Sequence, residues 1–261
     1  MILSYPASLW QKLYVIVLGP LLILVIMYAA YAWYPSISAP SGSPATFSIM
    51  VFAAAYTFVR LAVAYALAVV VAIPLAFLAL TNRTVESILL PIFDVLESIP
   101  ILAIFPFIVV IFIRFGFIEG AAIFILFINM LWNIVFALVG GLKIIPKDIN
   151  YAAAVYKLTG FAYVRRIAIP AIFPELITGS ILAVAEGWNL IIVAEALHAY
   201  IPGGTPAHDL FGIGSILVNA AAHAQNSTFL LSVFVLVGVI ALLNFFVWQK
   251  LLHYAQRFRF D

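Results

Sequence analysis

The chain has no cysteine and very few charged residues. Of its 261 residues, none is Cys, and Asp, Glu, Lys and Arg together make up 8%. The absence of cysteine excludes disulfides, thiolate metal sites and thiol nucleophiles. So few charges cannot cover the surface of a soluble fold of this length. The formal net charge of +2 also argues against a nucleic-acid partner.

Apolar residues are abundant instead. They make up 67% of the chain, and the mean hydropathy is +1.23. The apolar runs are long enough for helices that cross a hydrocarbon core, which takes about 20 residues, and they lack the alternation of a membrane β-barrel. The sequence therefore predicts an all-α membrane protein with six transmembrane helices. The predicted spans are 13–34, 49–80, 87–113, 121–142, 176–197 and 229–252.

Basic residues predict the topology. With six spans, most lysines and arginines fall on one side, which the positive-inside rule makes the cytoplasm. Both termini are then cytoplasmic, and the first span is expected to be a retained helix rather than a cleaved signal peptide. Arg60 lies within the second span, and Arg114 borders an outer loop. The residues on the cytoplasmic side are Lys12, Arg83, Lys143, Lys147, Lys157, Arg165, Arg166, Lys250, Arg257 and Arg259.

A polar, basic stretch at 150–175 lies between two long apolar segments, on the predicted cytoplasmic side. Pro146 can begin a helix and Gly160 can end it, and a second short helix over 161–169 can stop at Pro170. Its tyrosines and basic residues fit two interpretations equally well. One is an interfacial segment held by anionic lipid, and the other is a helix that binds a partner protein.

Several ordered motifs resemble one family. Tyr151-Ala152-Ala153, then Lys157, then 169–174 (IPAIFP) resembles the EAA loop of permease subunits of binding-protein-dependent ABC importers, whose pattern is Glu-Ala-Ala, a later Gly and a downstream Leu-Pro. Four more segments resemble the nitrate, sulfonate and taurine type, most closely one half of the fused two-domain permeases. They are 91–106 (PIFDVLESIPILAIFP), 187–189 (GWN), 192–195 (IVAE) and 254–258 (YAQRF).

The resemblance covers about 49–258 and implies a type I ABC importer permease fold. The permease core would be 49–258, after a first helix and outer linker at 1–48, with a coupling loop at 143–175 and an outer loop at 198–228 that includes a short helix near 213–224. The implied partners are a cytoplasmic ABC ATPase dimer, a second permease subunit and an extracytoplasmic solute-binding protein. The implied location of the chain itself is the cell membrane.

The implied ATPase-coupling residues depart from the family pattern in two places. Tyr151 replaces its Glu and Lys157 replaces its Gly, so Gly160 is expected to supply the turn. The chain has no phosphate-binding loop and no zinc or serine-hydrolase motif. We therefore expect that it has no catalytic residues and is not itself an enzyme. ATP and Mg would be bound by the partner ATPase. The coupling residues are Tyr151, Ala152, Ala153, Tyr156, Lys157, Gly160 and Pro170.

Polar residues inside the predicted spans are the candidates for a translocation path or gate. They occur in pairs on one helix face, and ionisable groups are costly there. The alternative is that they join helices, with Arg60 pairing an acid. Pro100 and Pro106 can kink the third span beside Glu97. The candidates are Asp94, Glu97, Pro100, Asn129, Asn133, Glu186 and Asn189.

Three functions fit these residues. The first is an ATP-driven importer permease, with the resemblance favouring small oxyanions or sulfonates as solutes. The second is an ion-coupled secondary carrier or channel that uses Asp94, Glu97 and Glu186, and the third is a membrane scaffold. No metal site is predicted, because His198, His208 and His223 of the outer loop lack metal-ligand spacing.

Overall fold

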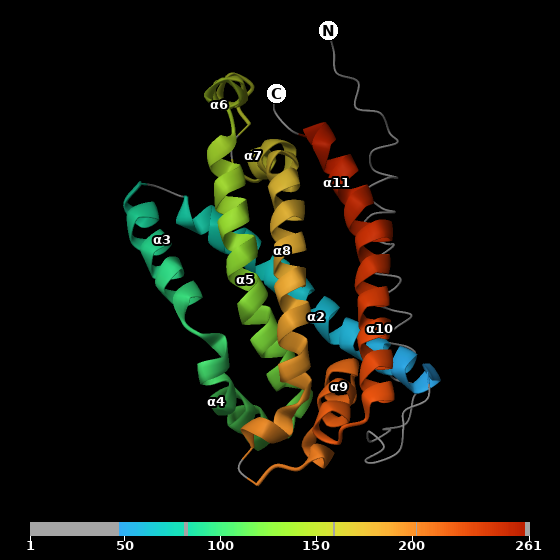
Figure 1. The fold of residues 1–261 in the computed structure, drawn as a ribbon. Coiled ribbons are helices and arrows are strands. Elements are labelled where there is room, and N and C mark those ends of the chain that lie inside the picture. Colours follow the sequence, from blue (N-terminus) through green and yellow to red (C-terminus); the bar gives the residue numbers. More distant parts are fainter. Residues whose placement is uncertain (1–46, 81–82, 159, 202, 259–261) are drawn as a thin grey trace.

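The computed structural model describes residues 47–80, 83–158, 160–201 and 203–258, and these ranges contain helices and no strands (Figure 1). The predicted first span, 13–34, lies outside the described residues. Within them, four helical stretches are long and apolar enough to cross a membrane, or five if one bent helix pair counts as a span. The predicted all-α membrane fold is confirmed in this part of the chain.

The long helices follow the predicted spans closely, apart from one that begins earlier. α8 starts at Ile169 rather than at 176, so Pro170 lies in its first turn instead of ending a helix. A π-helical turn precedes it, in which the Ile169 N–H donates to the Val164 carbonyl. The long elements are α2 (Phe47–Ala79), α5 (Ile118–Ile144), α8 (Ile169–Glu195), and α10 (Asn226–Leu243), which continues through η4 (Asn244–Trp248) into α11 (Gln249–Ala255).

The predicted third span is wrong as a single helix. Its residues form α3 (Arg83–Ser98) and α4 (Ile101–Arg114), which are bent by 82° relative to each other. Pro100 is the N-cap of α4 and has extended geometry, with φ −61° and ψ 104°. Proline lacks an N–H donor and disfavours helical geometry in the residue before it, so the break falls here.

The core lies where α2 crosses α5 and α8, which run side by side (Figure 1). Small residues allow this close approach. A Cβ at Gly179 would collide with the side chain of Ala137 on α5, and one at Gly187 would collide with Met130. Ala183, between them, is fully buried. The small-residue stripe of α8 therefore serves helix packing within the chain.

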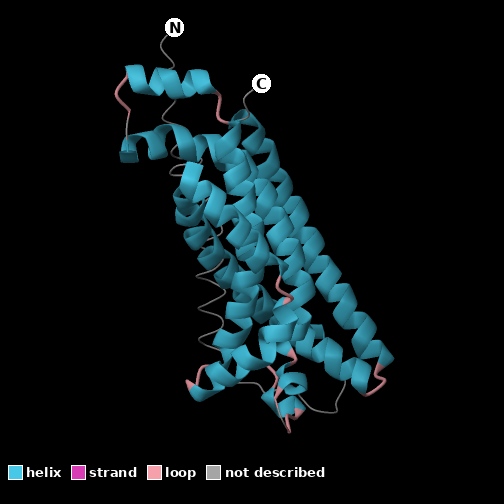
Figure 2. Ribbon diagram, turned by 90° about the vertical axis from the view of Figure 1, so that its left-hand side faces the viewer, coloured by secondary structure: helices cyan, strands magenta, loops and turns pink. Residues whose placement is uncertain are grey.

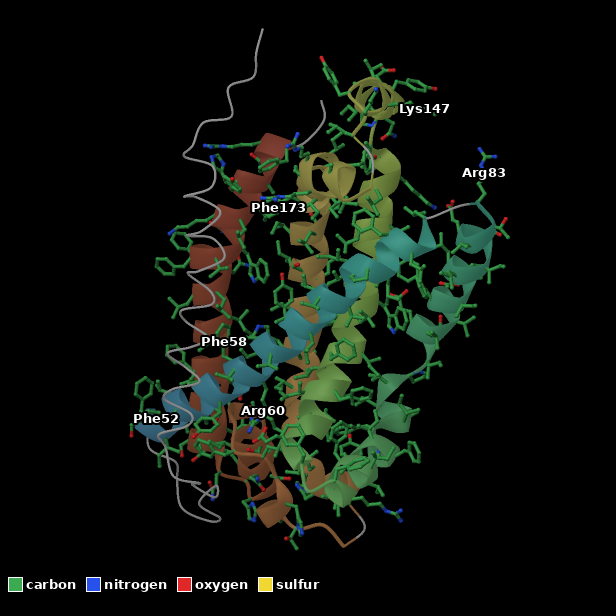
Figure 3. The ribbon with its side chains drawn as sticks, turned by 180° about the vertical axis from the view of Figure 1, so that it is seen from behind. Phe52, Phe58, Arg60, Arg83, Lys147 and Phe173 are labelled. Carbon is green, nitrogen blue, oxygen red and sulfur yellow. The ribbon has the colours of Figure 1, made fainter. Side chains whose placement is uncertain are left out.

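Short helices cover the two ends of the bundle (Figure 2). One end, here called the α6 end, carries α6 (Lys147–Val155), α7 (Gly160–Tyr163) and the π-helical turn η1 (Val164–Ala168). The opposite α9 end carries η2 (Leu197–Tyr200), η3 (Pro206–His208) and α9 (Ile213–Ala222). The short helix predicted near 213–224 is thus confirmed. Arg83 and Lys147 lie at the α6 end, whereas Arg60 lies toward the other (Figure 3).

Candidate functional site

Helix α6 holds the residues that match the EAA pattern, and its two ends are well defined. Pro146 is its N-cap, and Asp148 lies in the first turn, where a negative charge is favoured. At the other end, the Leu158 N–H donates to the Ala153 carbonyl at 2.9 Å, and the Lys157 N–H donates to Ala154 at 3.0 Å. These two bonds make up a Schellman cap.

Lys157 forms the turn that ends α6. Its φ of 53° lies in the left-handed region, where a residue with a side chain is less stable by about 1–2 kcal/mol. The expectation that Gly160 replaces this turn is wrong, because Lys157, at the position of the glycine in the family pattern, itself adopts the left-handed conformation. Gly160 makes a second turn, with φ 56°, at the start of α7.

One face of α6 is anchored and the rest is open. Ala153 is buried, and Ile149 packs against a small apolar cluster formed by Ile145, Ala168 and Ala171. By contrast, the exposed fractions of Tyr151, Val155 and Tyr156 are 67%, 79% and 77%. Figure 2 shows α6 as the outermost helix at its end of the bundle. An exposed aromatic and aliphatic surface of this kind is typical of a protein contact.

The α6 and α7 helices are fastened to each other and to the bundle. The Tyr163 hydroxyl donates to Asn150 Oδ1 at 2.6 Å, and burial raises the pKa of this tyrosine. Helix α7 continues through η1 into α8, where the Phe173 ring (Figure 3) lies 5.9 Å from that of Tyr254 and 5.5 Å from that of Phe258. Movement of α6 would therefore be passed to α8 and to the C-terminal helix.

The polar residues predicted inside the spans converge on the α5–α8 contact. Asn133 Nδ2 donates to Glu186 Oε2 at 2.7 Å, and Asn129 Nδ2 lies 3.5 Å from the same oxygen. Glu97 of α3 is within electrostatic range of Asp94 and Glu186. The structure thus joins three of the candidate residues by side-chain contacts, while Asp94 and Glu97 lie on α3, and all three carboxylates are exposed in the isolated chain.

Asn189 and Pro100 border this polar face. Asn189 is exposed and lies one turn beyond Glu186 on α8. Pro100 is at the break between α3 and α4, three residues after Glu97. The predicted kink beside Glu97 is present, as a break in the helix.

A buried ion network lies nearer the α9 end. The Arg60 guanidinium of α2 donates to Glu119 of α5, at 2.6 and 2.8 Å, and to Glu195 of α8 at 2.7 Å. Thr57 donates to the same Glu195 oxygen at 2.7 Å. Arg60 and Glu195 side chains are 4% and 0% exposed, so each charge depends on its partner rather than on solvent.

The network also fastens α9 to the bundle. Glu195 Oε2 accepts the Gly214 N–H at 2.8 Å, and Thr57 Oγ1 accepts the Ile213 N–H at 3.0 Å. A Cβ at Gly212 would collide with the Glu195 carboxylate, so this close approach needs glycine. The first N–H groups of a helix lack partners within it, and here buried side chains of α2 and α8 satisfy two of them.

Sequence reasoning found only part of this network. It proposed an acid partner for Arg60 but named neither Glu119 nor Glu195 for that role. The available signal was one charged residue in or beside each of three apolar spans, since such charges need partners. The loop 198–228 contains a smaller cluster, in which the His198 ring lies 2.8 Å from the buried side chain of Asp209. Among the described residues, no group of three His, Cys, Asp or Glu side chains can hold a metal ion.

Crossed apolar helices, a buried ion network and a polar face within the spans are typical of a polytopic helical membrane protein. The chain belongs to the family of binding-protein-dependent transport system inner membrane components, whose model matches residues 68–259. The prediction from the EAA-like loop and the motifs around it is thereby confirmed.

Relatives in this family include permeases for small anions. The chain is 33% identical over 184 residues to the nitrate import permease protein NrtB of Leptolyngbya laminosa, covering 70% of this chain and 61% of the relative. It is 30% identical over 193 residues to the bicarbonate transport system permease protein CmpB of Synechococcus elongatus, covering 73% and 65%. The matched region thus spans a little under two thirds of each relative.

Proposed function

We propose that this chain is the transmembrane permease of an ATP-driven importer for a small oxyanion, and that α6 is its coupling helix. Family membership supports the importer class, and the names of the relatives, which refer to nitrate and bicarbonate, support the solute class. The observation that carries the coupling role is the projection of α6 beyond the bundle, with Tyr151, Val155 and Tyr156 exposed where the EAA pattern falls.

The α6 end is proposed to face the cytoplasm, where an ATPase dimer binds ATP and Mg²⁺. Arg83 and Lys147 lie at this end, as the positive-inside rule expects (Figure 3). The α9 end then faces outward and offers the loop 198–228 to a solute-binding protein. A second permease copy or homologue would complete the path, because Asp94, Glu97 and Glu186 are exposed on a single chain.

Alternating access follows from how α6 is attached. When the ATPase pair closes on ATP, it displaces α6, and the displacement reaches α8 through α7 and η1. Helix α8 carries Glu186 midway and Glu195 at its end, so its motion changes the polar face and the contact with α9 together. The break at Pro100 supplies a hinge beside Glu97.

The test is ATP-dependent nitrate uptake by proteoliposomes that contain the full chain with its ATPase, partner permease and binding protein. Uptake is expected to require ATP and to be competed by bicarbonate or another small oxyanion. Deleting Tyr151 to Gly160 is expected to release the ATPase while the chain remains in the membrane. ATP-independent uptake driven by a proton gradient would overturn the proposal.

A further inference from the structure

We propose that Lys157 is a specificity-determining residue for the ATPase partner, and that its ammonium group recognises a carboxylate at the rim of the groove that receives α6. The inference rests on the proposed function. It adds the chemistry of the partner surface at one contact. Lys157 follows the C-terminal end of the coupling helix, directly after Val155 and Tyr156.

The backbone at this position gives no reason for a lysine. The cap that ends α6 consists of N–H groups of Lys157 and Leu158 bound to carbonyls of Ala154 and Ala153. Glycine would make the same two bonds without strain at a φ of 53°. A side chain held in an unfavourable backbone conformation points to a role for that side chain.

Contacts within the chain give no reason either. Lys157 is exposed, and none of the ion pairs among the described residues includes it. In the stretch 147–157, the acid Asp148 lies at the opposite end of α6. Lys157 therefore presents its charge outward beside two exposed apolar side chains. The complementary surface on the ATPase is an apolar groove with a carboxylate at its rim. A charged group at the rim of an interface affects which partner binds and how fast it associates.

The position of α6 favours a protein rather than a lipid headgroup as the occupant. An interfacial helix turns its apolar face toward the bilayer. In α6 the inward side, with Ile149 and Ala153, is already packed on the protein, and the helix lies beyond α7 at the tip of the bundle (Figure 2). Its exposed Tyr151, Val155 and Tyr156 are thus available to a docking subunit.

The ATPase is first identified by co-purification with the full chain. Its binding to the full chain in nanodiscs of zwitterionic lipid is then measured at low and at high salt. Lys157→Gly is expected to weaken binding on the order of tenfold at low salt and to reduce the salt dependence. Lys157→Glu is expected to weaken it further. Arg83→Glu reverses an exposed charge at the α6 end but on α3, outside the coupling helix, so it is the matched control and should stay within about twofold of wild type.

Lys157→Gly retains the cap, so the melting temperature of this variant should equal or exceed that of the wild type. If its affinity and salt dependence match the wild type, the inference is overturned. An effect that appears only in nanodiscs of anionic lipid would also overturn it, because a headgroup would then be the partner.

A double variant, Tyr151→Ala with Tyr156→Ala, separates this inference from the proposed function. If the double variant loses the ATPase while Lys157→Gly retains it, the docking helix stands and only the role of Lys157 fails. If neither variant loses it, α6 is not the docking site, and the coupling part of the proposed function fails as well.

Discussion

Arg60 and Glu195 are 135 residues apart in the chain, yet Nη1 of one lies 2.7 Å from Oε1 of the other. Their side chains come from α2 and from the last residue of α8, and both are buried. Because Glu195 also accepts the Gly214 N–H, one carboxylate joins two spans to the short helix α9. Such an arrangement is stable only while every polar group in it has a partner.

Glu195→Ala should therefore destabilise the protein strongly. The variant leaves buried Arg60 with only one of its two carboxylate partners, Glu119, and removes the acceptor of the Gly214 N–H. Breaking a buried ion pair in this way costs about 3–5 kcal/mol. Thermal unfolding in detergent, followed by tryptophan fluorescence, measures the loss. Glu86→Ala is the control, because the pair of Glu86 with Lys143 has side chains 32% and 46% exposed and such pairs contribute at most about 1 kcal/mol. Equal melting temperatures for the two variants would contradict this reading.

Two glycine substitutions should have opposite effects. Gly179→Ala places a methyl group against Ala137 and 3.3 Å from the Asn133 carbonyl, so overpacking at the α5–α8 contact should cost about 1–3 kcal/mol. Gly140→Ala meets nothing within 4 Å and should stabilise α5 by about 0.5–1 kcal/mol, because alanine is the better helix former. The measurement is the melting temperature of each variant in the same detergent. A gain in stability for Gly179→Ala would show that α5 and α8 are less closely packed than described.

Much of the helical layout could be predicted because span length and hydropathy follow directly from bilayer thickness. The early start of α8 could not be predicted, since a proline often marks the end of a helix and no sequence pattern indicated the π-helical turn that precedes Pro170. The break at Pro100 was signalled by proline, but its angle of 82° depends on how α3 and α4 pack on α5. The position of a proline thus predicts where a helix is interrupted, but not the angle between the two parts.

The candidate site shows the same division. Spacing alone placed Asn129 with Asn133, yet their common partner Glu186 lies on another helix, and spacing within a helix cannot identify partners across helices. The turn at Lys157 was missed because lysine rarely adopts positive φ, so Gly160 was the better local candidate. Glu119 was overlooked because it lies at the edge of an apolar run, where a charge usually meets solvent.

Tyr163 should titrate above the ordinary tyrosine pKa of 10.0, because burial favours its neutral form. The folded state then holds this proton more tightly than the unfolded state. Its contribution to stability is fully present below pH 10 and is lost as the pH rises through the higher folded pKa. A titration of tyrosinate absorbance, taken as wild type minus Tyr163→Phe, isolates this group. A midpoint at or below 10 would contradict the prediction.

Asn133→Leu should lower the transport rate by about tenfold or more while the protein remains folded. A tenfold decrease corresponds to an activation free energy that is higher by about 1.4 kcal/mol in the rate-limiting step. Leucine has a similar volume and suits an apolar span, but it removes the 2.7 Å donor of Glu186 and leaves that carboxylate oriented only by the longer Asn129 contact. If the polar face is the solute path, uptake falls although the melting temperature holds; if it only joins helices, the melting temperature falls and uptake per folded molecule does not. Val237→Asn is the control for polarity alone, since Val237 is an exposed residue of α10 and lies outside the Asn133–Glu186 contact. Comparing uptake per folded molecule for the two variants therefore assigns the Asn133–Glu186 contact either to transport or to helix association.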